Sequence, residues 1–127
     1  MIEIPAVASS LLVNGVVVSQ TSFIGADRPN LHPAVLAFVD SLPEEKRRSF
    51  TGRCAETALI SDQLWALDSR RSEGGHTDLQ AAEAHFRGAV LTSRMIREPG
   101  NQDHGKAVSP CPVCSALLAR LNVSVMD

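Results

Sequence analysis

Four residues in two short stretches have the types and the spacing that a metal-dependent reaction needs. Cys54 lies two positions before Glu56 in the stretch GRCAETALISDQL, at the predicted start of a helix, and Cys111 and Cys114 lie in SPCPVCSALLARL. Two thiolates three positions apart share one side of a helical turn and can bind a single tetrahedral ion. With Cys54 they account for every cysteine of the chain. The sequence therefore predicts a metal site that joins the two stretches.

Helical geometry predicts where the ion must lie. Residues two apart on a helix differ by about 200° in direction, so Cys54 and Glu56 can serve one ion only if it lies beyond the N-terminus of their helix. Side chains of the first turn lean in that direction. Because Pro112 disfavours the helical conformation at Cys111, the second helix is predicted to begin at Pro112. The N–H groups of both helix starts then point at the ion and can donate to the thiolates.

The N-terminal part of the chain is predicted to form a hairpin and a helix. In ASSLLVNGVVVSQTS, two β-rich runs flank Asn14 and Gly15, the pair that best tolerates the positive φ angles of a tight turn. Residues 23–30 are rich in turn formers and are predicted to be a loop. From Pro33 onward the apolar residues follow helical spacing, and Pro43 ends or bends that helix.

The rest of the chain alternates helices and strands. In order, we predict a charged connection (43–52), a helix from after Gly52 to about Ser69, a short helix capped by Thr77 or Asp78 and reaching Phe86, a strand (88–97), a loop (98–110), a helix (112–121) and a final strand (122–126). The order of elements predicts an α/β fold in which helices cover a mixed sheet of about four strands.

Composition limits the classes of protein that fit. The 127 residues, 44% hydrophobic and 20% charged, suit one domain over 1–127. The longest apolar stretch is interrupted by Asn14-Gly15 and is shorter than the roughly 20 residues of a membrane helix. With no secretory signal at the N-terminus, we expect a cytoplasmic chain or a domain excised from a longer one, and three cysteines argue against a disulfide framework. The net charge of −2 gives no electrostatic case for nucleic acid.

The two cysteine motifs also resemble a known signature. Cys54-Ala55-Glu56 and PCPVC (110–114) are similar to the C-A-E and P-C-x-x-C motifs of the cytidine deaminase superfamily. The runs LHPAVLAFVDSLP and GRCAETALISDQL resemble the YwqJ-like branch of bacterial deaminases, which includes many toxin domains. The resemblance covers residues 8–126. It implies a cytidine-deaminase-like three-layer α/β/α sandwich.

The resemblance also assigns roles to the motif residues. It implies that Cys54, Cys111 and Cys114 bind Zn²⁺ and that Glu56 shuttles protons in the hydrolytic deamination of a nucleobase, with cytosine favoured, in nucleic acid or a nucleotide. A toxin-type member would be secreted as part of a larger protein and meet an immunity protein. The fifth strand usual in the superfamily is missing from the predicted elements, so a second copy could cover the open sheet edge in a homo-oligomer.

Five further residues are weaker candidates for the site. Thr21 and Ser22, at the end of the second predicted strand, resemble in placement the residues that contact the base in this superfamily. His104 lies in the loop before the cysteine pair, where a substrate could pass. Arg53 or Arg94 could offset the charge of the thiolates. Each has an ordinary interpretation as a strand end or a surface residue.

Several alternatives remain open from the sequence. The cysteines could form a structural zinc knuckle completed by one of the four histidines, at positions 32, 76, 85 and 104, or Cys111 and Cys114 could be a redox pair. A deaminase could act instead on a free nucleoside or another small amidine. A non-catalytic zinc module serving an interaction is the third functional class. Trp65 is predicted to be a core residue rather than a stacking platform.

Overall fold

A tight antiparallel hairpin opens the protein in the computed structural model, which describes residues 6–23, 30–48, 50 and 52–126. Strand β1 (Val7–Val13) and strand β2 (Val16–Thr21) pair across Asn14 and Gly15, whose φ angles are 51° and 78°. Positive φ at both central positions is what a type I′ turn requires. The predicted hairpin is confirmed, whereas most of the loop predicted for 23–30 lies outside the described residues.

The hairpin belongs to a mixed sheet of four strands in the order β2-β1-β3-β4. Strand β3 (Val90–Met95) runs antiparallel to β1, and the short strand β4 (Ser124–Met126) runs parallel to β3. The segment before the cysteine pair pairs with the same edge of β3, beyond the end of β4. Ala107 of this segment forms an antiparallel bridge with Arg94. The predicted number of strands and the mixed directions are confirmed.

Three longer helices agree with the three main helices predicted from the sequence: α1 (Pro33–Ser41), α3 (Ala55–Ser69) and α5 (Pro112–Arg120). The stretch predicted as a charged connection contains one more helical turn, α2 (Glu44–Arg47). Its acidic residues lie in the first turn and its basic residues in the last, which suits the helix dipole. Helix α4 (Leu79–Ala82) is shorter than predicted, and Asp78 caps it by accepting from the N–H of Ala81 at 2.7 Å.

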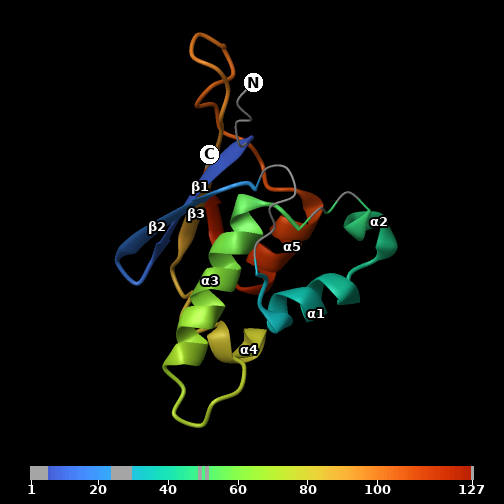
Figure 1. Ribbon diagram of the computed structural model, residues 1–127, viewed down its shortest axis with the longest axis vertical. Coiled ribbons are helices and arrows are strands. Elements are labelled where there is room, and N and C mark those ends of the chain that lie inside the picture. Colours follow the sequence, from blue (N-terminus) through green and yellow to red (C-terminus); the bar gives the residue numbers. More distant parts are fainter. Residues whose placement is uncertain (1–5, 24–29, 49, 51, 127) are drawn as a thin grey trace.

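The helices lie on one face of the sheet (Figure 1). Helix α3 packs on β1 and β2, α5 lies against β4, and α1 and α2 pack on the helices rather than on the strands. On the covered face, Leu11 and Leu91 are opposite each other and fully buried. The opposite face carries Leu12, Val17 and Met126, which are 43%, 65% and 56% exposed.

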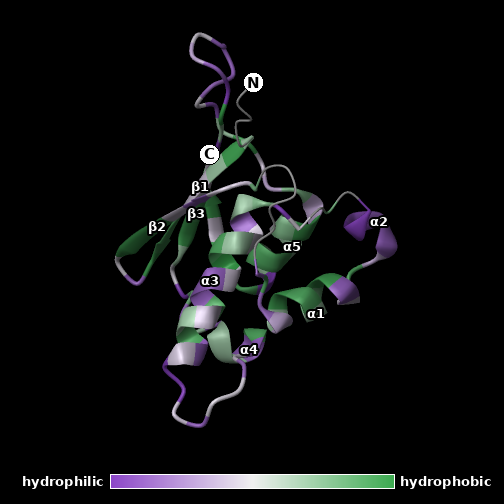
Figure 2. Ribbon diagram, viewed as in Figure 1, coloured by the Kyte–Doolittle hydropathy of each residue, from purple (hydrophilic) through white to green (hydrophobic). Residues whose placement is uncertain are grey.

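The α/β class is therefore confirmed, but the layers run in a different order from the expected α/β/α sandwich. Across the described residues they are the sheet, then α3 with α5, then α1 with α2 (Figure 1). The main apolar core lies between the sheet and the helices, where the ribbon is mostly green, while α2 is purple (Figure 2). Trp65, predicted as core, is half-buried and donates its indole N–H to the carbonyl of Asn30 at 2.7 Å. No described helix has the length and apolar character needed to cross a membrane.

Candidate metal centre

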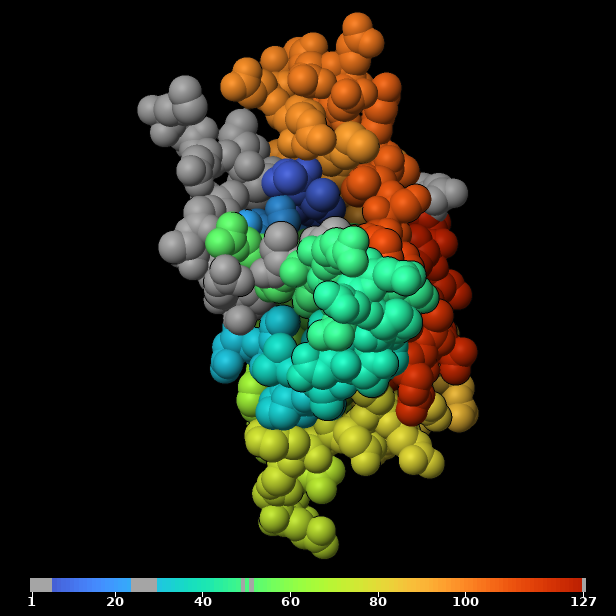
Figure 3. All heavy atoms as spheres, turned by 90° about the vertical axis from the view of Figure 1, so that its right-hand side faces the viewer, coloured from blue at the N-terminus to red at the C-terminus, as the bar shows by residue number. Residues whose placement is uncertain are grey.

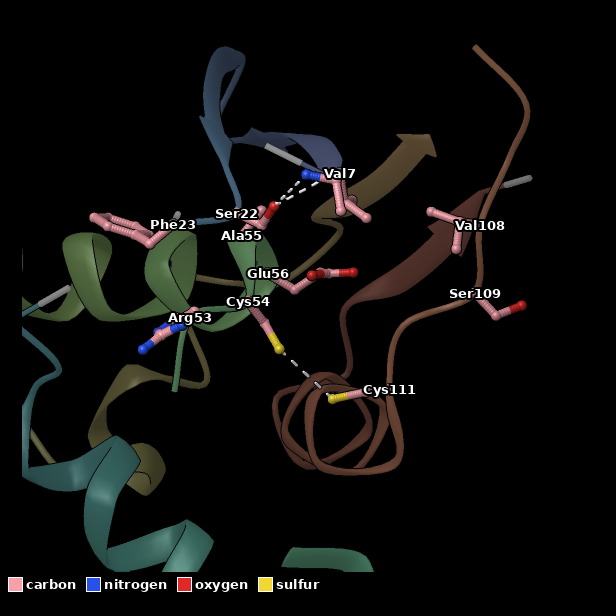
Figure 4. A pocket seen from close by; sticks show the side chains of 11 residues that line it. Val7, Ser22, Phe23, Arg53, Cys54, Ala55, Glu56, Val108, Ser109 and Cys111 are labelled. Atoms are coloured by element: carbon pink, nitrogen blue, oxygen red, sulfur yellow. Dashed lines mark hydrogen bonds between the residues drawn. The ribbon is translucent and has the colours of Figure 1, made fainter. Parts of the chain in front are cut away.

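The three cysteines meet at the N-termini of two helices. Cys54 is the N-cap of α3, Cys111 is the N-cap of α5, and Cys114 lies in the first turn of α5. The Sγ atoms of Cys54 and Cys111 are 3.8 Å apart, and all three Sγ atoms lie within 4.8 Å of one another. In Figure 4 the side chains of Cys54 and Cys111 point toward each other across the gap between the two helix starts.

The local sequence accounts for this placement. Pro112 occupies the first position of α5, where its fixed φ suits a helix start, and Cys111 before it is extended. The Sγ of Cys111 accepts from the backbone N–H of Cys114 at 3.4 Å, so the thiol replaces the polar side chain that usually caps a helix. Cys54 has the same extended conformation at the start of α3.

The spacing of the sulfurs fits a zinc ion. Zinc binds thiolate sulfur at about 2.3 Å in tetrahedral geometry, which places two sulfur ligands about 3.8 Å apart. Cys54 and Cys111 have that separation. No histidine, aspartate or glutamate of the described residues joins the three cysteines in the cluster. Three protein ligands with one position left open is the arrangement of catalytic rather than structural zinc sites.

Thiol ionisation also favours a cation here. Hydrogen bonding with Cys114 and Cys54 lowers the pKa of Cys111, while sharing the same hydrogen bonds with Cys111 raises the pKa of both Cys54 and Cys114. Burial raises the pKa values further. Three thiolates this close repel one another, so all three ionise together only when a cation lies between them. Binding of a divalent ion would therefore release protons.

Glu56 extends from the first turn of α3 into the same site and is only 6% exposed. Its Oε2 accepts a hydrogen bond from the hydroxyl of Ser93 at 3.1 Å. Burial raises the pKa of Glu56, and hydrogen bonds from its own backbone N–H and from Ser93 partly oppose this. A buried carboxyl with a raised pKa, placed beside three thiols, is suited to accepting and returning a proton.

Glu56, Cys54 and Cys111 share the wall of one pocket of about 420 Å³ (Figure 4). This volume is within the range of roughly 300–1,000 Å³ typical of small-molecule sites. The other lining residues come from the start of β1, the segment after β2, the start of α3 and the segment before α5; they are Ala6, Val7, Ser22, Phe23, Arg53, Ala55, Val108 and Ser109.

The model of the YwqJ-like deaminase family matches residues 3–123, nearly the whole chain and both halves of this pocket. The chain belongs to the YwqJ-like deaminase family. A search of curated proteins and a search of solved structures each found no match. The resemblance to this family, drawn from the runs LHPAVLAFVDSLP and GRCAETALISDQL, is thus confirmed.

The three candidate substrate contacts, Thr21, Ser22 and His104, have different positions in the structure. Ser22 lines the pocket, and its Oγ accepts from the N–H groups of Ala6 and Val7 at 3.0 and 3.2 Å. Thr21 is exposed and is not among the residues lining the pocket, because its register opposite Ala8 places it on the uncovered face of the sheet. His104 is exposed in the 98–107 loop, which projects at the top of the molecule (Figure 3). Its Nδ1 accepts from the N–H of Arg97 at 2.9 Å.

The two arginines predicted to offset thiolate charge have different positions. Arg53 lines the pocket, but its guanidinium points away from the sulfurs of Cys54 and Cys111 (Figure 4). Arg94 lies opposite Ala8 on the uncovered face of the sheet and is exposed, which agrees with its ordinary interpretation as a surface residue. The structure instead places the N–H of Cys114, in the first turn of α5, within hydrogen-bond distance of the Cys111 thiol.

A second group of residues has the composition of a metal site, but the histidine nitrogen that would bind the metal carries a proton. Atoms of His32, Asp68 and His76 lie within 4.8 Å of one another. The Nδ1 of His32 accepts from the N–H of Ala34, so in the neutral ring the proton is on Nε2, which donates to Asp68 at 2.7 Å. A metal would need the Nε2 lone pair and a proton on Nδ1. We therefore interpret this group as a hydrogen-bond network that ties α1 to the end of α3.

The remaining histidines are also engaged away from the cysteines. The ring of His85 contacts the side-chain amide of Asn14 at 3.1 Å and that of Gln63 at 2.7 Å, which holds the hairpin turn to α3. With His32 and His76 in the Asp68 network and His104 in the projecting loop, none of the four histidines belongs to the cysteine cluster. The geometry thus does not support a zinc knuckle completed by a histidine.

Two polar residues of the site had no place in the sequence-based prediction. Ser93 bonds Glu56, and Ser9 bonds Ser93, with 2.7 Å between the two Oγ atoms. Both serines are 1% exposed. The signal that could have revealed Ser93 is its position two residues after Leu91, because a serine on the buried face of a strand needs a polar partner.

Proposed function

We propose that this deaminase binds Zn²⁺ through Cys54, Cys111 and Cys114 and hydrolyses the amidine of a nucleobase, cytosine first, in nucleic acid or a nucleotide. The observation that carries the proposal is the pairing of three convergent thiols, which leave a fourth position open, with a buried carboxyl on the wall of the same pocket. Closed structural zinc sites have no use for such a carboxyl.

The ion, when bound, would activate a water molecule for attack on the ring carbon that bears the amino group. The Glu56 carboxylate accepts the proton that this water loses and delivers it to the ring nitrogen. A second proton passes through Glu56 to the amino group, the carbon–nitrogen bond breaks, and ammonia leaves. The water oxygen becomes the carbonyl of the product.

The pocket walls suit a flat heteroaromatic ring. Phe23, Val7 and Val108 give apolar surface for the ring faces. Ser22 accepts two backbone N–H bonds, so its own hydroxyl hydrogen is directed elsewhere and can donate to a carbonyl or ring nitrogen of the substrate. We propose Ser22 as a substrate contact on this ground.

A free nucleoside or another small amidine is the second candidate substrate. The net charge of −2 supplies no general attraction for a phosphate backbone, which favours a small substrate over a polymer. The chemistry at Glu56 would be the same for either substrate.

One experiment separates these possibilities. The purified, zinc-loaded chain is incubated with cytidine, adenosine, single-stranded DNA and RNA, and mass spectrometry measures uracil- and hypoxanthine-containing products. We expect conversion of cytosine to uracil in cytidine, in single-stranded DNA or in RNA. Glu56→Gln should retain about one zinc per chain and lose at least about 100-fold in rate, whereas Glu98→Gln, in the exposed loop, should behave as wild type. A wild-type protein that binds zinc and releases no ammonia from any substrate would contradict the proposal and favour a non-catalytic zinc module.

A further inference from the structure

Two buried serines form a hydrogen-bond chain that ends on the Glu56 carboxylate. The hydroxyl of Ser93 donates to Oε2 of Glu56 at 3.1 Å. A hydroxyl has one hydrogen to donate, so the contact between Ser9 and Ser93, with their Oγ atoms 2.7 Å apart, must run from Ser9 to Ser93. The direction of both hydrogen bonds is therefore fixed while the carboxylate accepts.

The two serines of this hydrogen-bond series lie on the buried face of the sheet, where apolar side chains are expected. Ser9 of β1 and Ser93 of β3 are directly opposite each other in the register, on the helix-covered face that also carries Leu11 and Leu91. A buried hydroxyl without a hydrogen-bond partner destabilises the fold, whereas an apolar side chain at the same position would stabilise it. The carboxylate of Glu56 is the hydrogen-bond acceptor at the end of this series, and it accounts for two hydroxyls on the buried face.

The backbone at Ser93 connects the chain to the rest of the pocket. The carbonyl of Ser93 accepts from the N–H of Val108 at 3.0 Å. Val108 and Ser109 line the pocket and lead into Cys111. One strand residue thus contacts the carboxyl through its side chain and the segment before the cysteine pair through its backbone.

We propose that Ser93, oriented by Ser9, is a positioning residue that fixes the Glu56 carboxylate for proton transfer. This inference rests on the proposed deaminase function. With Oε2 held by Ser93, the proton that Glu56 takes from water bonds to Oε1, and the same oxygen returns it to the ring nitrogen of the substrate. Without the hydroxyl the carboxylate is free to rotate, and small displacements of a reacting group reduce rates strongly.

The kinetic test uses Ser93→Ala, Ser9→Ala and the double variant on whichever of the four substrates the wild type converts. Ser93→Ala should lower kcat about 10- to 100-fold while KM changes less than about twofold and zinc content stays at that of wild type. Ser9→Ala should lower kcat less, and adding it to Ser93→Ala should have no further effect because Ser9 acts through Ser93. The proposal would be overturned if the loss of kcat in the double variant equalled the product of the two single losses. It would also be overturned if Ser93→Ala kept the kcat of the wild type.

The chain offers a matched control. Ser10 and Ser19 form a second pair of opposed strand serines, 2.8 Å apart, on the uncovered face of the sheet. Ser10→Ala removes the same kind of hydrogen bond from the neighbouring residue of the same strand and should leave kcat, KM and zinc content unchanged. A loss of kcat in Ser10→Ala equal to that in Ser9→Ala would show a general effect on the sheet and contradict the proposal.

A second measurement needs no substrate. In ¹³C-labelled, zinc-loaded protein, the δ-carbon resonance of Glu56, assigned with Glu56→Gln, should shift in Ser93→Ala and not in Ser10→Ala. An unchanged resonance in Ser93→Ala would overturn the proposal. If no substrate is converted by the wild type, the proposed function fails, while this resonance still decides whether Ser93 holds the carboxylate.

Discussion

The sulfur atoms of Cys54 and Cys111 lie 3.8 Å apart although 57 positions separate the two residues. Each residue occupies the N-cap position of a helix, and the relative placement of α3 and α5 brings the two positions together. The distance therefore depends on tertiary packing as well as on the local motifs. A site of this kind should bind its ion only when both helix starts are intact.

Replacement of Cys111 tests the ligand set. Cys111→Ser removes the sulfur that contacts both other cysteines, and we expect zinc content to fall from about one ion per chain to near zero after dialysis, measured by atomic emission. Ser115→Ala changes an exposed hydroxyl one residue beyond Cys114 and should keep its zinc. Full zinc occupancy in Cys111→Ser would contradict the assignment of Cys111 as a ligand.

Removal of the metal should also lower stability. Binding to the folded state alone contributes about 2.7 kcal/mol when free zinc is 100 times its Kd, so a chelator should lower the free energy of unfolding by at least about that amount and reduce Tm. The measurement is a thermal melt with and without EDTA. The melt of Cys111→Ser should not respond to EDTA, and an equal response would show that the chelator acts at another place.

The parts of the fold that local signals determine could be predicted from the sequence. Asn14-Gly15 specifies the hairpin turn, and Pro33 and Pro112 mark two helix starts by their backbone restrictions. The metal-site hypothesis could also be formed from the sequence, because three cysteines in two short motifs leave few alternatives.

The parts that depend on long-range pairing could not be predicted. Thr21 and Ser22 are adjacent, and only the register of β1 with its neighbours decides that Ser22 lines the pocket and Thr21 does not. The same parity places Ser93 next to Glu56 and Arg94 on the other face. The order of the layers likewise depends on which face of the sheet the helices pack against, and no local sequence pattern predicts that face.

The uncovered face of the sheet can be tested with two adjacent leucines. Leu11 is fully buried and Leu12 is 43% exposed, on opposite faces of β1. Leu11→Ala should lower the free energy of unfolding by about 2–5 kcal/mol, and Leu12→Ala by less than about 1 kcal/mol. Both values come from urea titrations. Since the two substitutions share a strand and a residue type, equal losses would mean that the second face is covered in solution.

The Asp68 network should give the protein a pH-dependent part of its stability. The Asp68 carboxylate accepts from the N–H of Thr77 at 2.6 Å and contacts the rings of His32 and His76 at 2.7 and 2.9 Å. Desolvation opposes ionisation, but the hydrogen bonds from His76, Thr77 and His32 outweigh it and hold the pKa of Asp68 well below its usual range. Asp68→Asn should therefore lower the free energy of unfolding at pH 7 by about 2–4 kcal/mol.

The sign of the pH effect follows from that lowered pKa. A carboxyl whose pKa is lower in the folded than in the unfolded state stabilises the fold fully above the unfolded pKa of about 3.9, and the contribution is lost as the pH falls toward the folded pKa. The difference between wild type and Asp68→Asn should accordingly shrink below about pH 4 in urea titrations at successive pH values. Asp40→Asn, exposed on α1, should show no such difference at any pH. A gap that stays constant from pH 7 to about pH 3 would mean that the Asp68 carboxylate is not held by its hydrogen bonds.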